Sequence, residues 1–91
     1  DIVLNGNYLY ASAWQNDRLN IIDISDPLNL TMAGGITNAQ LDGIATVKYV
    51  EGYILTAAEN VDRFVIINAT NPASPTIATS IQNTTSLDYA A

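Results

Sequence analysis

Short apolar runs alternate with turn residues along the whole chain, and no segment shows the period of an amphipathic helix. The runs predict eight β-strands, four in each half of the chain, at residues 1–5, 8–13, 18–25, 31–37, 44–50, 53–58, 63–70 and 76–82. Pro27 and Pro72 mark the end of the third strand in each half, because proline lacks a backbone donor and restricts the residue before it. The pattern therefore predicts an all-β chain.

The two halves are copies of one repeat. An offset of 45 positions aligns them without a gap over most of their length, and one extra residue restores the register near the end. Identical pairs include Tyr8/Tyr53, Ala13/Ala58, Asp17/Asp62, Arg18/Arg63, Ile21/Ile66, Ile22/Ile67, Pro27/Pro72, Thr31/Thr76 and Ile36/Ile81. We predict two repeats, residues 1–45 and 46–91, that form one structural unit. Four antiparallel strands in about 45 residues is the size of a β-propeller blade.

The third strand of each repeat also resembles a known family. Residues 19–29 read as a branched-aliphatic run followed by Asp, Ile, Ser and Asp-Pro, and residues 64–75 follow the same order with Asn for the first Asp. This pattern resembles LVIVD-type β-propeller repeats, as do the Asn-Tyr and Gly-Tyr openings of the second strands at residues 7–11 and 52–56. The resemblance implies propeller blades, which in this family usually belong to a full ring, often at a cell surface. It implies a fold more than an activity.

Composition narrows the classes of partner. The chain has 48% hydrophobic and only 13% charged residues, so much of its surface is expected to be covered. Its net charge of −6 disfavours nucleic acid and anionic membranes, which require clustered cations. No apolar run is long enough to span a membrane, and no signal peptide is visible. With neither Cys nor His, disulfides and structural zinc are not expected to stabilise so small a chain.

Self-association is the remaining source of stability. Two blades bury one interface and leave two apolar faces in water, and each Å² left exposed forfeits about 25 cal/mol. Ala91 followed by Asp1 of another copy would continue the repeat in phase, so head-to-tail contacts could close a ring. We predict a homo-oligomer, with a six-bladed trimer favoured over an eight-bladed tetramer. The alternative is a fragment of a longer propeller, since the chain does not begin with Met.

Four residues are candidates for ligand binding. Trp14 has no aromatic counterpart in the second repeat, and with Asn16 and Arg18 it could contact a sugar; the alternative is a tryptophan that packs between blades. Arg18 and Arg63 follow a turn aspartate in each repeat and could bind an anion. The alternative for both is structural, with the arginine stem covering the edge of the blade.

Asp42 and Asp88 are candidates for metal binding. Each precedes the innermost strand of the next blade, so a ring would gather carboxylates that could bind calcium, although an ordinary turn aspartate is the alternative. We expect no other cofactor. Without His or Cys the common nucleophile–base pairs are missing, and no carboxylate pair has a distinctive spacing.

These observations favour a non-enzymatic β-propeller scaffold that binds a ligand or protein at a loop face or in its central channel. A carbohydrate-binding lectin with sites between blades is the alternative, and a hydrolase that uses ring carboxylates is the weakest. An extracellular, virion or cell-surface setting is favoured. The sequence leaves the ligand open.

Overall fold

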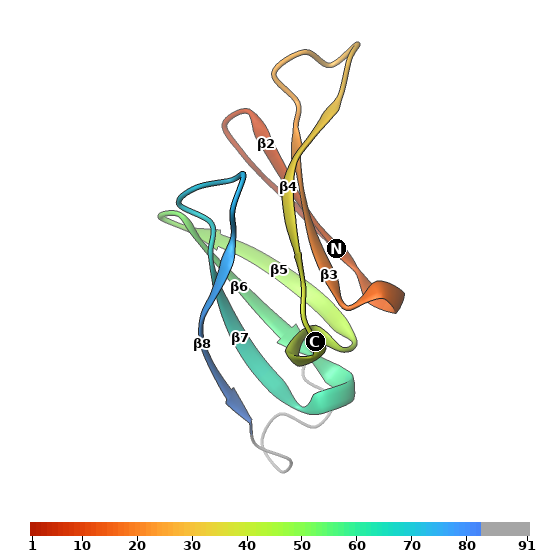
Figure 1. Ribbon diagram of the computed structural model, residues 1–91, viewed down its shortest axis with the longest axis vertical. Coiled ribbons are helices and arrows are strands. Elements are labelled where there is room, and N and C mark those ends of the chain that lie inside the picture. Colours follow the sequence, from red (N-terminus) through yellow and green to blue (C-terminus); the bar gives the residue numbers. More distant parts are fainter. Residues whose placement is uncertain (83–91) are drawn as a thin grey trace.

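The computed structural model describes residues 1–82 as two four-stranded antiparallel sheets packed face to face (Figure 1). The first sheet contains β1 (Ile2–Asn5), β2 (Tyr8–Ala13), β3 (Arg18–Asp23) and β4 (Thr31–Thr37). The second contains β5 (Ile44–Val50), β6 (Tyr53–Ala58), β7 (Arg63–Asn68) and β8 (Thr76–Gln82). Within each sheet the strands are in sequence order, so every connection joins neighbours. The predicted all-β chain with two four-stranded sheets is confirmed.

The third strand of each sheet ends two residues earlier than the sequence predicted. The side chain of Asp23 accepts a hydrogen bond from the Ser25 N–H at 2.8 Å, and that of Asn68 accepts one from the Thr70 N–H at 3.0 Å. Such side-chain bonds compete with the ladder and turn the backbone away from the neighbouring strand. The prediction that β3 reaches residue 25 and β7 residue 70 was therefore wrong.

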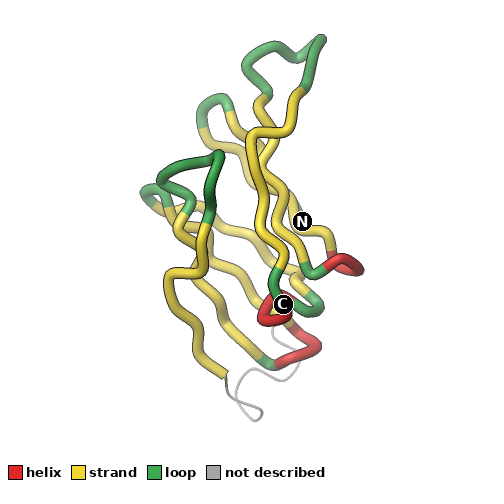
Figure 2. Tube along the Cα trace, in the orientation of Figure 1, coloured by secondary structure: helices red, strands yellow, loops and turns green. Residues whose placement is uncertain are grey.

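Three single turns of 3₁₀ helix were not predicted: η1 (Trp14–Asn16), η2 (Ala39–Leu41) and η3 (Glu59–Val61). All three lie at one end of the molecule, and the tight turns and long loops lie at the other (Figure 2). Asp17 and Asp62 follow η1 and η3 with φ near +50°, which Asp tolerates better than most residues. The repeated Asp therefore ends the 3₁₀ turn and starts the third strand.

The core lies at the seam, which we define as the boundary between the two sheets. From the first sheet it contains Tyr10, Leu19 and Ile21, and from the second it contains residues that include Val47, Ile54, Val65 and Ile67. Strand register places the contributors of each sheet on one face, because residues paired across strands share a face. Leu41 and Ile44, from the connection between the sheets and the start of β5, complete the core.

Each sheet also has an outward face, on the side away from the seam. In the first sheet the outward face contains Ile2, Leu4 and Met32, which are largely exposed. In the second sheet it contains Tyr53 and Ile81, also exposed, together with the partly buried Leu55 and Ile66. Residues 1–82 therefore bury one apolar boundary and leave two apolar faces open.

Candidate functional site at the seam and its outward counterpart

The two arginines occupy the same position in each sheet. The Arg18 Nε donates to Asn20 Oδ1 at 2.7 Å and its Nη1 to Thr37 Oγ1 at 3.0 Å. A Cβ placed on Gly35 would lie 2.3 Å from Arg18 Nη2, so the guanidinium lies against this glycine. Arg63 donates to Ser80 Oγ at 3.0 Å and to Gln82 Oε1 at 3.4 Å. Both side chains therefore tie the third strand to the fourth.

Ser80 extends the Arg63 network across the seam. Its hydroxyl donates to Gln40 Oε1 at 2.5 Å, and Gln40 belongs to η2 in the connection between the sheets. Through Ser80, Arg63 is therefore linked to the connection between the two sheets. Anion binding by Arg18 and Arg63 stays a prediction.

Trp14 and Asn16 lie in η1, both exposed, with 46% of the Trp14 surface accessible. Their short helical turn is one residue from the start of β3, where the Arg18 head group bonds to its own sheet. The predicted sugar-contacting patch of Trp14, Asn16 and Arg18 stays a prediction. The exposure of Trp14 shows that within the described chain it does not serve as a core residue.

Asp42 lies directly after η2, at the joint between the sheets. Its Oδ1 accepts a hydrogen bond from Asn60 Nδ2 at 3.0 Å, and its carbonyl accepts one from the Asn60 N–H at 3.2 Å. Within residues 1–82 no three metal-ligating side chains gather at one place. The other predicted calcium ligand, Asp88, lies outside the described residues. Calcium binding stays a prediction.

A polar cleft, which sequence reasoning missed, opens between the sheets at the end that carries the turns. Its volume is about 470 Å³, within the usual range for small-molecule sites. The first sheet contributes Asn5, Tyr8 and Tyr10, and the second contributes Tyr49 and Glu51 together with Gly52, Ala69, Thr70 and Pro72. We call this space the seam cleft. None of the chain's three Lys and Arg residues lines it.

The three tyrosines of the seam cleft lie close together. The ring centroids of Tyr10 and Tyr49 are 5.4 Å apart across the seam. Burial raises the pKa of Tyr10, and the neighbouring Tyr49 and Tyr8 raise it further, so Tyr10 remains a neutral phenol at physiological pH. The cleft therefore presents phenol groups beside one carboxamide and one carboxylate.

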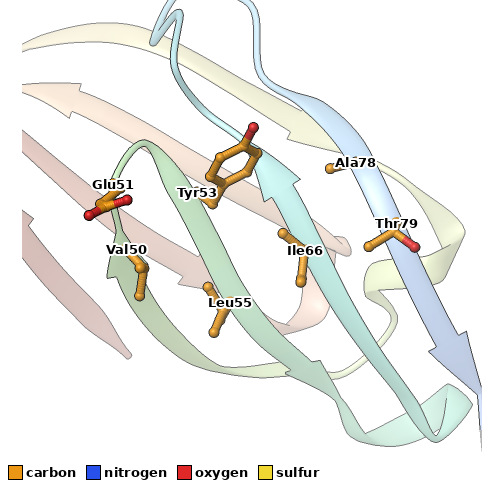
Figure 3. A pocket seen from close by; sticks show the side chains of 7 residues that line it. All are labelled: Val50, Glu51, Tyr53, Leu55, Ile66, Ala78 and Thr79. Carbon is orange, nitrogen blue, oxygen red and sulfur yellow. The ribbon is translucent and has the colours of Figure 1, made fainter.

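A second hollow, of about 390 Å³, lies on the outward face of the second sheet. Figure 3 shows side chains from all four strands gathered around it: Val50, Tyr53, Leu55, Ile66, Ala78 and Thr79. Its lining is almost entirely apolar. Glu51 lies at its margin, with its carboxylate turned away from the other labelled side chains. We call this space the outward hollow.

One family model matches the chain, and the match covers the first of the two repeats. Residues 1–37 match the family model of the LVIVD repeat. These residues form the first sheet, from β1 to β4. The resemblance read from the sequence is thereby confirmed, and the two sheets are consistent with blades of a propeller-type module. A search of curated proteins and a search of solved structures each found no match.

The second sheet repeats the arrangement of the first. Its strands pair in the same order and with the same irregularity between the third and fourth strands, after Ile21 in one sheet and after Ile66 in the other. In the described part of the chain, no helix is both long and apolar enough to cross a membrane. The comparisons give a blade architecture and leave the ligand and the assembly to be proposed.

Proposed function

We propose that this LVIVD protein is a non-enzymatic binding module whose copies assemble head to tail into a closed β-propeller, with six blades in a trimer favoured and eight in a tetramer second. One observation carries the proposal. Each outward face corresponds, residue by residue, to a face that is buried at the seam.

The outward face of the first sheet corresponds to the seam face of the second. Ile2, Leu4, Ile22 and Met32 occupy the repeat positions of Val47, Tyr49, Ile67 and Ile77, which belong to the core or pack against it. The strand registers match as well, because Leu4 pairs with Leu9 and Tyr49 with Ile54. The first sheet therefore offers outward the same kind of surface that the second sheet buries.

The converse holds for the second sheet. Its outward residues Tyr53, Leu55, Phe64, Ile66 and Ile81 occupy the repeat positions of Tyr8, Tyr10, Leu19, Ile21 and Ile36, which lie at the seam. The two open faces are thus complementary to each other and not each to itself. Such heterologous contacts generate rings when the rotation between units closes.

The outward hollow supports a copy as its occupant. At the seam the β7–β8 loop lies so close to β4 that a Cβ on Gly34 would be 2.2 Å from the Pro72 carbonyl oxygen. The equivalent position on the outward face holds Thr79, so an incoming β3–β4 loop must lie farther out. Leu28, at the repeat position of Ala73, is 95% exposed on that loop and would fill the extra space.

The mass of the protein in solution tests the assembly. Light scattering at micromolar concentration is expected to give three copies per particle; four copies would change only the blade number. Leu4→Asp, on an outward face, is expected to yield smaller particles, whereas Gln15→Glu adds the same charge in exposed η1 and should leave the mass unchanged. A stable, well-folded monomer would refute the proposed ring. It would also refute the alternative that the chain is a piece of a longer propeller, because two blades without neighbours are then expected to be unstable or to aggregate.

A carbohydrate-binding lectin is the second candidate, supported by the exposed Trp14 beside Asn16 in η1. A glycan array with Trp14→Ala as the control tests it. Binding of a glycan that is lost in the Trp14→Ala protein would support the lectin. Failure to bind any glycan, or binding that Trp14→Ala leaves intact, would reject this patch.

A further inference from the structure

The seam cleft and the outward hollow occupy equivalent positions in the repeat, yet their chemistry differs. Asn5 and Tyr10 of the cleft correspond to Val50 and Leu55 of the hollow. On the opposite wall, Tyr49 and Glu51 correspond to Leu4 and Gly6 of the first sheet. At four positions the blade framework accepts an apolar residue or glycine, and at the seam each is polar.

Packing alone does not require these polar groups. The same framework holds Val, Leu, Leu and Gly at the equivalent positions, and apolar residues would bury more favourably between two sheets. Glu51 also adopts φ +49°, where the first sheet has Gly6 at φ +59°. A left-handed backbone is unfavourable for a residue with a Cβ, so the carboxylate is present despite a local cost.

We propose that the seam cleft is a binding site for a small organic cation of the alkylammonium class. The proposal deepens the binding function proposed above, and it does not require the ring because every wall of the cleft belongs to one chain. Aromatic rings together with a carboxylate are the groups that attract alkylammonium ions. The cleft offers the partly exposed Tyr8 and Tyr49 together with the exposed Glu51, and no cationic side chain lines it.

The charge of the chain favours the same class of ligand. With a net charge of −6, the protein attracts cations and repels phosphates and carboxylates at long range. The volume of about 470 Å³ accommodates a small molecule. A neutral sugar is the competing ligand, since phenol and amide groups also bind hydroxyls, and the experiment separates the two.

Titration with choline chloride, followed by amide chemical shifts in NMR spectra, tests the site. Gly52 and Ala69 both line the cleft, and the Ala69 N–H donates to the Gly52 carbonyl at 2.8 Å. The amide signals of both residues are therefore expected to shift saturably. The Asn60 N–H, which donates to the Asp42 carbonyl at 3.2 Å at the opposite end of the molecule, is an internal control and should not shift. Sodium chloride at equal ionic strength controls for salt.

Variants that borrow the residue of the other repeat keep the fold and remove the chemistry. Glu51→Gly and Tyr49→Leu are expected to weaken choline binding by roughly threefold to tenfold each, and Glu51→Gln should act like Glu51→Gly. Glu59→Gln removes the same charge at the opposite end, in η3, and should leave binding unchanged. Glu51→Gly should also not lower stability, which separates loss of the ligand from loss of the fold.

Several outcomes would overturn the proposal. Choline that shifts neither Gly52 nor Ala69, or that binds equally well to the Glu51→Gly protein, would reject the site as a cation site. Shifts caused by glucose or galactose and not by choline would replace the class of ligand. Because the cleft lies within one chain, saturable choline binding by a monomer would support this site while refuting the ring, so the two proposals fail separately.

Discussion

The seam and the two outward faces show what the same blade surface does with and without a neighbour. Ile67 at the seam is fully buried, whereas its repeat equivalent Ile22 is only partly buried on the outward face. Val47 is 1% exposed, whereas its equivalent Ile2 is 61% exposed. The residues are alike, so the difference in burial comes from the neighbour and not from the blade.

The comparison also separates what the repeat needs for packing from what one copy adds. Apolar character is common to both the seam and the outward faces. The polar residues Asn5, Tyr10 and Tyr49 line the seam cleft and not the outward hollow, whereas Glu51 borders both spaces. Both repeats therefore keep the apolar residues that pack sheet against sheet. Polar side chains replace some of these residues at the cleft where the two sheets meet.

The largest expected effect contrasts two equivalent isoleucines. Ile67→Ala leaves a cavity in the seam and should lower the free energy of unfolding by about 2–5 kcal/mol. Ile22→Ala should cost less in a single chain and should cost more as protein concentration rises, because assembly would bury it. Urea unfolding at two concentrations measures both. Equal losses that do not depend on concentration would contradict the view that the outward face is a docking face.

A glycine at the seam gives the next largest effect. A Cβ on Gly34 would lie 2.2 Å from the Pro72 carbonyl oxygen and 3.1 Å from Ala73 Cα, so Gly34→Ala must push the β7–β8 loop away. We expect a loss of about 1–3 kcal/mol in thermal or urea unfolding. Thr79→Ala, at the equivalent exposed position, is the control and should be nearly neutral in the monomer. Unaltered stability of Gly34→Ala would show that the loop does not pack as described.

The strands were predictable because the repeat shows each of them twice. Six of the eight strands end where the turn residues and β-branched runs indicated, and the two exceptions are β3 and β7. There the run of apolar residues continues to Ile24 and Ala69, but the Asp23 and Asn68 side chains bond to the backbone two residues later. A pattern of apolar positions cannot register such a local competition.

The candidate site was less predictable. Arg18, Arg63 and Asp42 were predicted as binding residues because they are charged. In the structure each forms a hydrogen bond with a nearby side chain. The seam cleft joins Asn5 and Tyr10 to Tyr49 and Glu51, which are about one repeat away in sequence and become neighbours only when the sheets pack. A signal for it was present: these are repeat positions at which an apolar residue or glycine in one copy becomes polar in the other.

A buried threonine at the seam gives a smaller effect of opposite sign. Thr56 Oγ1 is buried and finds no hydrogen-bond partner in the described part of the chain, and the first sheet has Ala11 at the equivalent position. Thr56→Val keeps the shape and removes the unpaired hydroxyl, so it should raise the free energy of unfolding by about 1 kcal/mol. Thr31→Val, at an exposed position, should change it by less than about 0.5 kcal/mol. A destabilised Thr56→Val protein would indicate a partner for the hydroxyl.

The smallest effect contrasts the two turns that end the third strands. Hydrogen bonds from the Ser25 hydroxyl and then from its N–H hold the pKa of Asp23 below its usual value. A carboxyl whose pKa is lower in the folded state adds stability above its unfolded pKa, near 3.9, and loses it as pH falls through the folded pKa. Asp23→Asn should therefore flatten the decline of stability below about pH 4, measured by urea unfolding.

The second sheet supplies the reciprocal test, because Asn68 already makes the same turn with an amide. Its Oδ1 accepts hydrogen bonds from the Thr70 N–H and hydroxyl, at 3.0 and 2.7 Å. Asn68→Asp should therefore add a contribution to the free energy of unfolding that is lost as pH falls, which is the contribution that Asp23→Asn removes. Both proteins should keep the turn at neutral pH. If neither exchange altered the acid limb of the stability curve, the carboxylate at Asp23 would contribute nothing that an amide does not, and the two turns would be energetically equivalent.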